Sequence, residues 1–142
     1  MRTPIRHLAL PLALVAMLLV AGCNMLGGGS GELVGPTWQW TASTTTAPAS
    51  QSVTPDPENY TITFANDGTY SGKADCNNIA GTYTTSGSTL TIKPGPSTMA
   101  ACPEGSQDAF YVAGLLATQS YAITNGELVL TTTDGTMTFK KG

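Results

Sequence analysis

The chain has 142 residues, of which 41% are hydrophobic, with six Lys and Arg against nine Asp and Glu. This length fits one domain with a modest core. A nucleic-acid-binding surface needs clustered Lys and Arg, so the few and scattered basic residues exclude that class of function.

The N-terminus has the pattern of an export signal. Arg2 and Arg6 precede the apolar run LALPLALVAMLLVAG, which is shorter than the about 20 residues of a membrane-spanning helix. The run ends in VAGC, which resembles the bacterial lipobox. We therefore expect residues 1–22 to be removed and Cys23 to become the acylated N-terminus, since two or more acyl chains anchor a protein stably. The alternative is an ordinary signal peptide followed by a stray cysteine.

Residues 23–35 are predicted to form a flexible tether, because they contain the sequence GGGSG. Residues 36–142 then form the folded domain. Removal of residues 1–22 leaves four lysines, nine acidic residues and neither arginine nor histidine. We expect attachment to the membrane through the lipid alone, in the bacterial cell envelope. In a two-membrane organism, Asn24 favours an anchor on the periplasmic face of the outer membrane. In a single-membrane organism, the anchor lies on the extracellular face of the cell membrane.

Alternating apolar and polar residues predict half-buried strands along most of the domain. Tight-turn residues separate these runs at 66–68, 86–88, 125–126 and 134–135. The prediction is a mainly β fold, a small antiparallel β-barrel-like sheet. Its predicted core consists of Trp38, Trp40, Ile62, Phe64, Tyr70, Tyr83, Leu90, Ile92, Ile123, Leu128, Leu130 and Phe139.

Two segments lack this alternation. Residues 41–59 are rich in Thr, Ser and Pro, which predicts a long mobile loop. Residues 106–117 are predicted to form one short helix over the sheet, with Ser106 as N-cap and Asp108 in the first turn. Its apolar face is expected to consist of Ala109, Val112, Ala113 and Leu116.

Cys76 and Cys102 are the two cysteines that follow the lipobox. Alternation from Tyr70 places Cys76 on the inward face of its strand. We favour a disulfide between the two cysteines, because an exported chain meets oxidising conditions. The alternatives are two reduced buried thiols, or reactive chemistry. A cysteine nucleophile usually needs a nearby histidine, and a zinc site needs about four clustered ligands, so neither catalysis nor a metal is expected.

The residues around the cysteines resemble a known family. The pattern is G-x-x-x-C-N, G-x-Y, T-x-x-x-C-P, a short helix, an aromatic residue before a hairpin, and a final Phe. Its positions here are Gly72, Cys76, Asn77, Gly81, Tyr83, Thr98, Cys102, Pro103, Tyr121 and Phe139. This combination is similar to the META domain of HslJ-like bacterial envelope lipoproteins. The resemblance implies a link to envelope stress and novobiocin resistance, with no established catalytic residues.

For function, we expect a non-catalytic envelope factor that needs no cofactor and binds an envelope protein or a small apolar ligand. Aromatic residues at the barrel mouth, Trp38, Trp40 and Tyr121, are the candidate ligand contacts. Asn77 is a further candidate, although it and Asn78 are also suited to turning the chain. The alternative is a small hydrolase that uses Asp75 near Asn77, with a carboxylate from residues 41–59.

Overall fold

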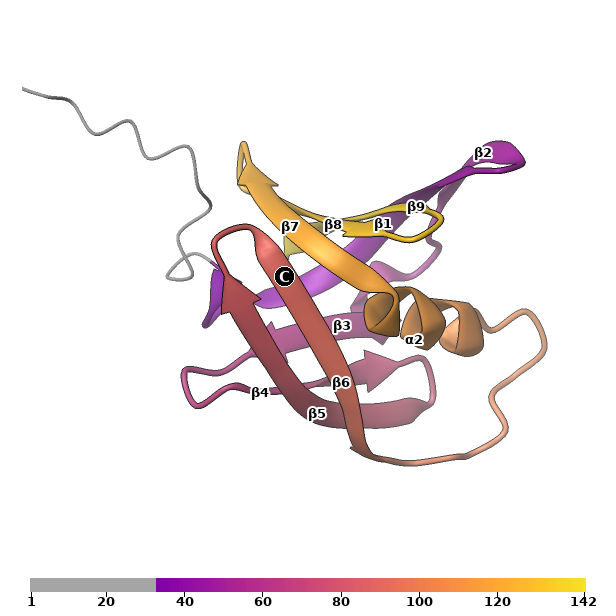
Figure 1. The fold of residues 1–142 in the computed structure, drawn as a ribbon. Coiled ribbons are helices and arrows are strands. Elements are labelled where there is room, and N and C mark those ends of the chain that lie inside the picture. The colour runs from indigo at the N-terminus through magenta and orange to yellow at the C-terminus, as the bar shows by residue number, and fades with distance from the viewer. Residues whose placement is uncertain (1–32) are drawn as a thin grey trace, which may run out of the picture.

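The computed structural model describes residues 33–142 (Figure 1). The predicted signal peptide, Cys23 and most of the tether lie outside this range. The described chain contains one helix, α2 (Asp108–Leu116), and a 3₁₀ turn, η1 (Pro57–Asn59). Its strands are β1 (Thr37–Thr46), β2 (Ala49–Val53), β3 (Tyr60–Phe64), β4 (Thr69–Ala74), β5 (Asn77–Ser86), β6 (Thr89–Ser97), β7 (Thr118–Thr124), β8 (Glu127–Thr132) and β9 (Gly135–Lys141).

All nine strands belong to one antiparallel sheet, which confirms the predicted fold class. Strands β3 to β9 pair with one another in chain order. Strand β1 pairs with both β3 and β9, so the sheet closes into a ring. Strand β2 stands outside the ring and pairs with the C-terminal half of β1. The sheet thus encloses one core and leaves β2 as an outer edge.

The predicted turns are present where Gly, Asn and Asp supply a positive φ. Asn125 and Gly126 have φ of 54° and 79°, and they join β7 to β8. Gly68, with φ of 83°, ends the turn between β3 and β4. Such values are costly for most residues and allow strands to reverse within two residues.

The core follows the predicted alternation. Of the predicted core residues, all are buried except Tyr83 and Ile123, which are partly buried and pack against the others. The core also contains Leu33, Tyr60, Ala74, Ile79, Tyr111, Leu115, Tyr121 and Met137. Most of these are contributed by inward-facing positions of strands, which is why the period of two reveals them.

The prediction of a mobile loop over residues 41–59 was wrong. Strand β1 continues to Thr46, and β2 pairs with it to form a projecting hairpin (Figure 1). Hydroxyl pairs join its two strands, with Ser43 Oγ 2.8 Å from Ser52 Oγ and Thr45 Oγ1 2.8 Å from Ser50 Oγ. Every residue of β2 is exposed. A strand that pairs through its backbone and hydroxyls buries nothing apolar, so it leaves no alternation to read.

The helix is present, but of its predicted apolar face only Val112 is partly buried and packs against the core. Tyr111 and Leu115 are its buried residues, whereas Ala109, Ala113 and Leu116 are exposed. The large Tyr111 ring packs against Trp40, Tyr60 and Phe139. The helix therefore buries its large aromatic side chain rather than the face that contains Ala109 and Ala113. Gln107, and not Ser106, occupies the N-cap position.

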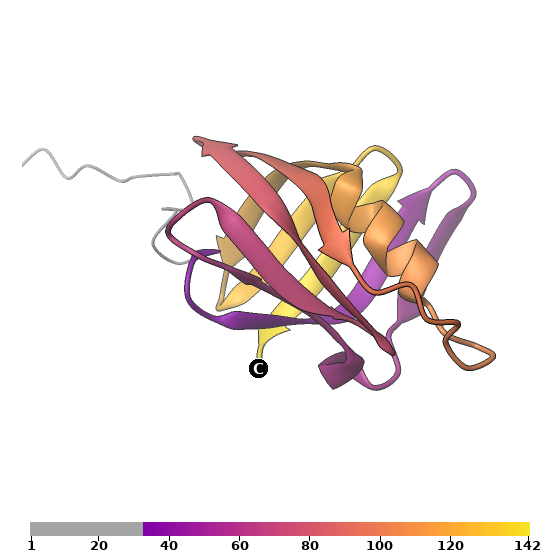
Figure 2. The same ribbon diagram turned by 90° about the horizontal axis from the view of Figure 1, so that it is seen from below.

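Helix α2 lies where the ring is weakest. Strands β6 and β7 share a single residue pair, Thr89 with Ser120, before they diverge. The helix lies beside this opening and contacts β4, β6 and β8 (Figure 2). The gap in the sheet is therefore covered by a helix that inserts an aromatic side chain into the core.

Candidate functional site

Cys76 and Cys102 form a disulfide, with their Cα atoms 5.5 Å apart. The expectation that Cys76 faces inward was wrong, since its side chain is exposed. Asp75 has a φ of 56°, which ends β4 and places Asp75 and Cys76 in the turn before β5. The disulfide therefore ties this turn to the segment that leads into α2, on the surface of the domain.

Asn77 is buried beside the disulfide, at the first position of β5. Its Nδ2 donates to the Ala100 carbonyl at 3.0 Å and contacts Cys102 Sγ at 3.4 Å. Its Oδ1 accepts from the Ala100 N–H at 2.8 Å and from the Thr98 hydroxyl at 3.0 Å. These contacts use the amide within the fold, so it holds the segment from Thr98 to Cys102 rather than facing a ligand.

The three aromatic candidates lie in the core. Trp38 and Trp40 have 0% exposure, and Tyr121 has 3%. Trp38 Nε1 donates to the Leu33 carbonyl and Trp40 Nε1 to the Ala42 carbonyl, each at 2.9 Å. The structure thus places these residues in the packed interior, where they stabilise the ring of strands.

Asp75 lies at the turn before β5, and its N–H donates to the Asn59 carbonyl at 2.7 Å. This bond brings the turn next to η1, which contains Glu58 and follows Asp56. Asn77, by contrast, directs its amide to the segment from Thr98 to Cys102. The structure therefore brings Asp75 near the end of the 41–59 segment but does not pair it with the Asn77 amide.

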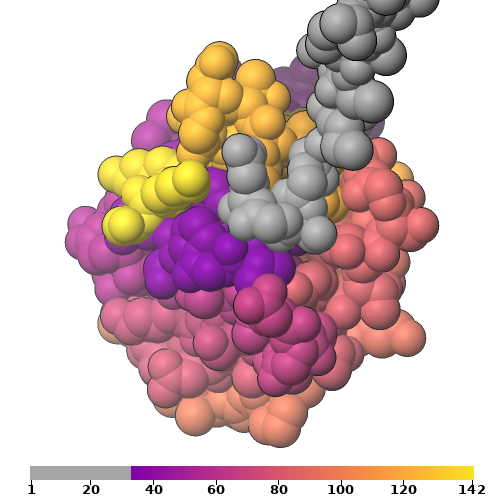
Figure 3. All heavy atoms as spheres, turned by 90° about the vertical axis from the view of Figure 1, so that its left-hand side faces the viewer, coloured from indigo at the N-terminus to yellow at the C-terminus, as the bar shows by residue number. Residues whose placement is uncertain are grey.

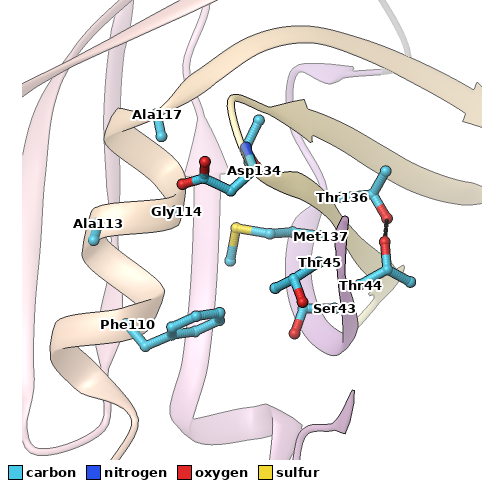
Figure 4. Close-up of a pocket in the computed structure, with 11 residues that line it drawn as sticks. Ser43, Thr44, Thr45, Phe110, Ala113, Gly114, Ala117, Asp134, Thr136 and Met137 are labelled. Atoms are coloured by element: carbon cyan, nitrogen blue, oxygen red, sulfur yellow. Dashed lines mark hydrogen bonds between the residues drawn. The ribbon is translucent and has the colours of Figure 1, made fainter. Parts of the chain in front are cut away.

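A groove of about 230 Å³ runs between α2 and the paired strands β1 and β9. Figure 4 shows the residues that line it. The helix contributes an apolar wall of Phe110, Ala113 and Ala117, and Met137 lies between the helix and the strands. The opposite wall is polar and consists of Ser43, Thr44, Thr45, Thr132, Asp134 and Thr136. We call this feature the α2 groove.

Phe110 is the most unusual residue of the α2 groove. Its side chain is 50% exposed, although it is large and apolar. The ring stacks on Trp40, with centroids 5.9 Å apart and planes inclined by 27°. The buried Trp40 therefore holds an exposed aromatic surface in a fixed position, and rigid aromatic surfaces of this kind are common in binding sites.

The floor of the groove is tightly packed. A Cβ atom added to Gly114 would lie 2.5 Å from Met137 Sδ, so the absence of a side chain at Gly114 lets Met137 lie against the helix. The hydroxyl groups of Thr44 and Thr136 are 2.7 Å apart on the opposite wall. The sequence alone did not predict this site, because its residues are contributed by three separated segments and no motif connects them.

The described residues offer no metal centre. Among residues 33–142, no three His, Cys, Asp or Glu side chains are grouped closely enough to hold a metal ion. In the same range there is no helix with the length and apolar character needed to cross a membrane.

The closed antiparallel sheet, the covering helix and the disulfide before it define a class of small β domains. The family model of the META domain matches residues 31–142, and the chain therefore belongs to the META domain family. No curated protein matches the chain significantly.

Solved structures share this fold. One is a protein of the DUF4847 family from Bacteroides vulgatus, with 17% identity and a TM-score of 0.59. The superposition covers 81% of this chain and 98% of the Bacteroides chain. Another is an NMR structure of a protein from Burkholderia xenovorans, with 18% identity and a TM-score of 0.65. The superposition covers 99% of this chain and 97% of the Burkholderia chain. At these identities the likeness concerns the fold alone.

Proposed function

We propose that the chain is a lipid-anchored protein of the bacterial envelope, whose META domain binds a small apolar ligand at the α2 groove and has no catalytic role. The observation that carries this proposal is the half-exposed Phe110 ring, fixed on Trp40 at the edge of a groove. Single exposed apolar side chains are common on protein surfaces, but this ring lies at the edge of a concave groove with an apolar wall, and small-molecule sites are concave and largely apolar.

The position of the groove suits a tethered domain. The described chain starts at the end of the molecule opposite α2 in both ribbon views (Figures 1 and 2). Figure 3 shows that end, where the C-terminus lies beside the start of β1, and Gly142 N–H donates to the Thr37 carbonyl there at 2.8 Å. An anchor that precedes Leu33 would leave the α2 groove on the far end from its point of attachment.

The sequence VAGC supports the anchor. We propose that Cys23 carries lipid, in the outer membrane of a two-membrane organism or on the outer face of a single membrane, and that the protein buffers the envelope against stress or an antibiotic. Mass spectrometry of the N-terminal peptide from isolated membranes should find a lipidated Cys23. A product cut elsewhere and recovered in the soluble fraction would contradict the anchor.

The binding proposal is tested on protein isolated from its own membranes. Small molecules released by denaturing the purified chain are compared between the wild type and Ala113→Phe, which fills the groove from an exposed helix position. Ala109→Phe is the matched control, because Ala109 is exposed on the same helix and does not line the groove. We expect one released compound with the wild type and the control, and none with Ala113→Phe.

Two results would overturn the proposal. One is the absence of any stoichiometric compound in the wild type. The other is a compound that all three proteins carry equally. The hydrolase alternative has its own test, since turnover of an envelope substrate that Asp75→Asn abolishes without unfolding the domain would favour an enzyme.

A further inference from the structure

The two ends of the α2 groove differ in chemistry. Phe110 lies at one end and Asp134 at the other, with the Met137 thioether between them (Figure 4). Phe110 offers exposed apolar surface and the nearly buried Met137 forms the apolar floor, whereas the Asp134 carboxylate extends toward the helix. A molecule lying along the groove would therefore meet apolar groups at one end and a negative charge at the other.

The charge at the Asp134 end is uncompensated. Within residues 33–142, Asp134 forms no ion pair, and its backbone carbonyl accepts hydrogen bonds from the N–H and hydroxyl of Thr46. The groove also passes the C-terminal end of α2, at Ala117, and the last turn of that helix has no basic residue. A helix C-terminus carries a partial negative charge that favours cations. Because the Ala117 carbonyl already accepts from the Thr133 N–H and the Gly114 carbonyl from the Thr118 hydroxyl, the Asp134 carboxylate is the main group that favours a positive charge here.

The apolar end limits the size of the ligand. An apolar cavity of about 150 Å³ holds one benzene molecule, so a groove of about 230 Å³ has room for one ring and a short arm. Phe110 can stack with a ring, and a thioether such as that of Met137 makes favourable contacts with aromatic groups. The hydroxyl groups of Thr44 and Thr136 already pair with each other and leave the apolar wall as the main contact surface.

From these observations we infer that the α2 groove binds a small amphiphilic amine. Its single ring or short alkyl body packs on Phe110 above the Met137 floor, and its ammonium group lies at the Asp134 carboxylate. This inference rests on the proposed function and modifies it in one respect, since the ligand keeps an apolar body but carries one ammonium group. A carboxylic acid of the same shape is disfavoured, because it would bring a second negative charge beside Asp134.

The test uses 3-phenylpropylamine as the probe and the full-length chain in nanodiscs of phosphatidylcholine, a lipid without net charge. Labelled methionine methyl groups report binding by NMR. Met137 lies in the groove, and Met99, which is 90% exposed and does not line it, serves as the internal reference. We expect a saturable shift of the Met137 methyl signal while the Met99 signal stays constant.

Three variants locate the two halves of the ligand. Asp134→Asn keeps the shape of the side chain and should weaken binding about three- to fivefold, the range of a partly exposed ion pair. Glu127→Gln removes an exposed carboxylate outside the groove and should leave binding unchanged. Ala113→Phe should abolish the Met137 shift.

The neutral analogue 3-phenylpropanol and the anionic 3-phenylpropanoate complete the experiment. We expect the alcohol to bind more weakly than the amine and the acid to bind most weakly of the three. Equal binding of amine and alcohol, or an Asp134→Asn variant that binds as the wild type does, would overturn the inference and leave the proposed binding function intact. No Met137 shift with any probe would also overturn it, and the released-compound comparison would then decide separately whether the domain binds a ligand.

Discussion

Asn77 pairs with Ala100 through both sides of its amide, in the way that one strand residue pairs with another. Its Nδ2 donates to the Ala100 carbonyl at 3.0 Å, and its Oδ1 accepts from the Ala100 N–H at 2.8 Å. The disulfide from the neighbouring Cys76 reaches Cys102, two residues beyond Ala100. A side chain and a covalent bond thus fix the same segment, which leads into α2.

We predict that Asn77→Ala lowers the free energy of unfolding by about 3 kcal/mol. A net contribution of about 1 kcal/mol for each hydrogen bond, together with the backbone groups left without a partner, gives this magnitude. Asn78→Ala is the matched control, because Asn78 is exposed, and it should change stability by less than about 0.5 kcal/mol. Urea denaturation measures both. Equal stabilities of the two variants would show that the Asn77–Ala100 pair contributes little.

The disulfide should contribute about 3.5 kcal/mol in the chain-entropy model, for the loop that it closes. We predict a loss of this size in the double variant Cys76→Ser and Cys102→Ser, measured by urea denaturation. Thiol counting on the unreduced, denatured domain should find neither of the two cysteines free. Finding both free in protein isolated from the envelope would contradict the bridge.

Tyr111 makes the free energy of unfolding depend on pH in the alkaline range. Burial, followed by the influence of Tyr70, raises the pKa of Tyr111 well above its usual value of 10.0. The folded domain therefore keeps this proton at a pH where the unfolded chain loses it, so the stability from Tyr111 is complete below pH 10 and falls as pH rises above it. Burial also raises the pKa values of Tyr70, Tyr83 and Tyr121, which adds to the same trend.

We predict that Tyr111→Phe loses less stability than the wild type between pH 9 and pH 11, as judged by denaturation at each pH. At neutral pH the variant should be at least as stable, because the Tyr111 hydroxyl is buried without a hydrogen-bond partner. A clear loss of stability at neutral pH would mean that this hydroxyl has a partner in solution.

Gly72 is required by the close approach of β3. A Cβ atom at this position would lie 2.0 Å from the Thr61 carbonyl oxygen, which belongs to the backbone and cannot rotate away. We predict that Gly72→Ala destabilises the domain by about 3 kcal/mol, the upper range for overpacking. Ser71→Ala, at an exposed position of the same strand, should have little effect. Thermal melting of both variants by circular dichroism provides the comparison.

Sequence patterns predicted the ring of strands well, and the reason is physical. Residues such as Ile62 and Phe64 alternate with threonines because one face of each strand is buried, and burial imposes a period of two. Strand β2 was not predicted, because none of its residues is buried and its sequence therefore shows no alternation. Cys76 was placed on the wrong face because the alternation was continued past Asp75, where the positive φ ends the strand.

The candidate site was less predictable. Aromatic residues such as Trp40 are equally expected in a core and at a binding surface, and only the three-dimensional packing distinguishes the two. Phe110 is the exposed ring, and it lies next to Tyr111, which is the buried one. Their roles depend on the direction in which α2 crosses the opening between β6 and β7, and this direction is set by contacts between distant segments.

We propose that this META domain binds its ligand in the α2 groove. The most direct measurement adds the compound released from the envelope-purified chain back to ligand-free protein and follows the Met137 and Met99 methyl signals. We expect a saturable shift of the Met137 signal, an unchanged Met99 signal, and no Met137 shift in Ala113→Phe. A compound that rebinds without moving the Met137 signal, or that moves it equally in Ala113→Phe, would show that the ligand binds elsewhere.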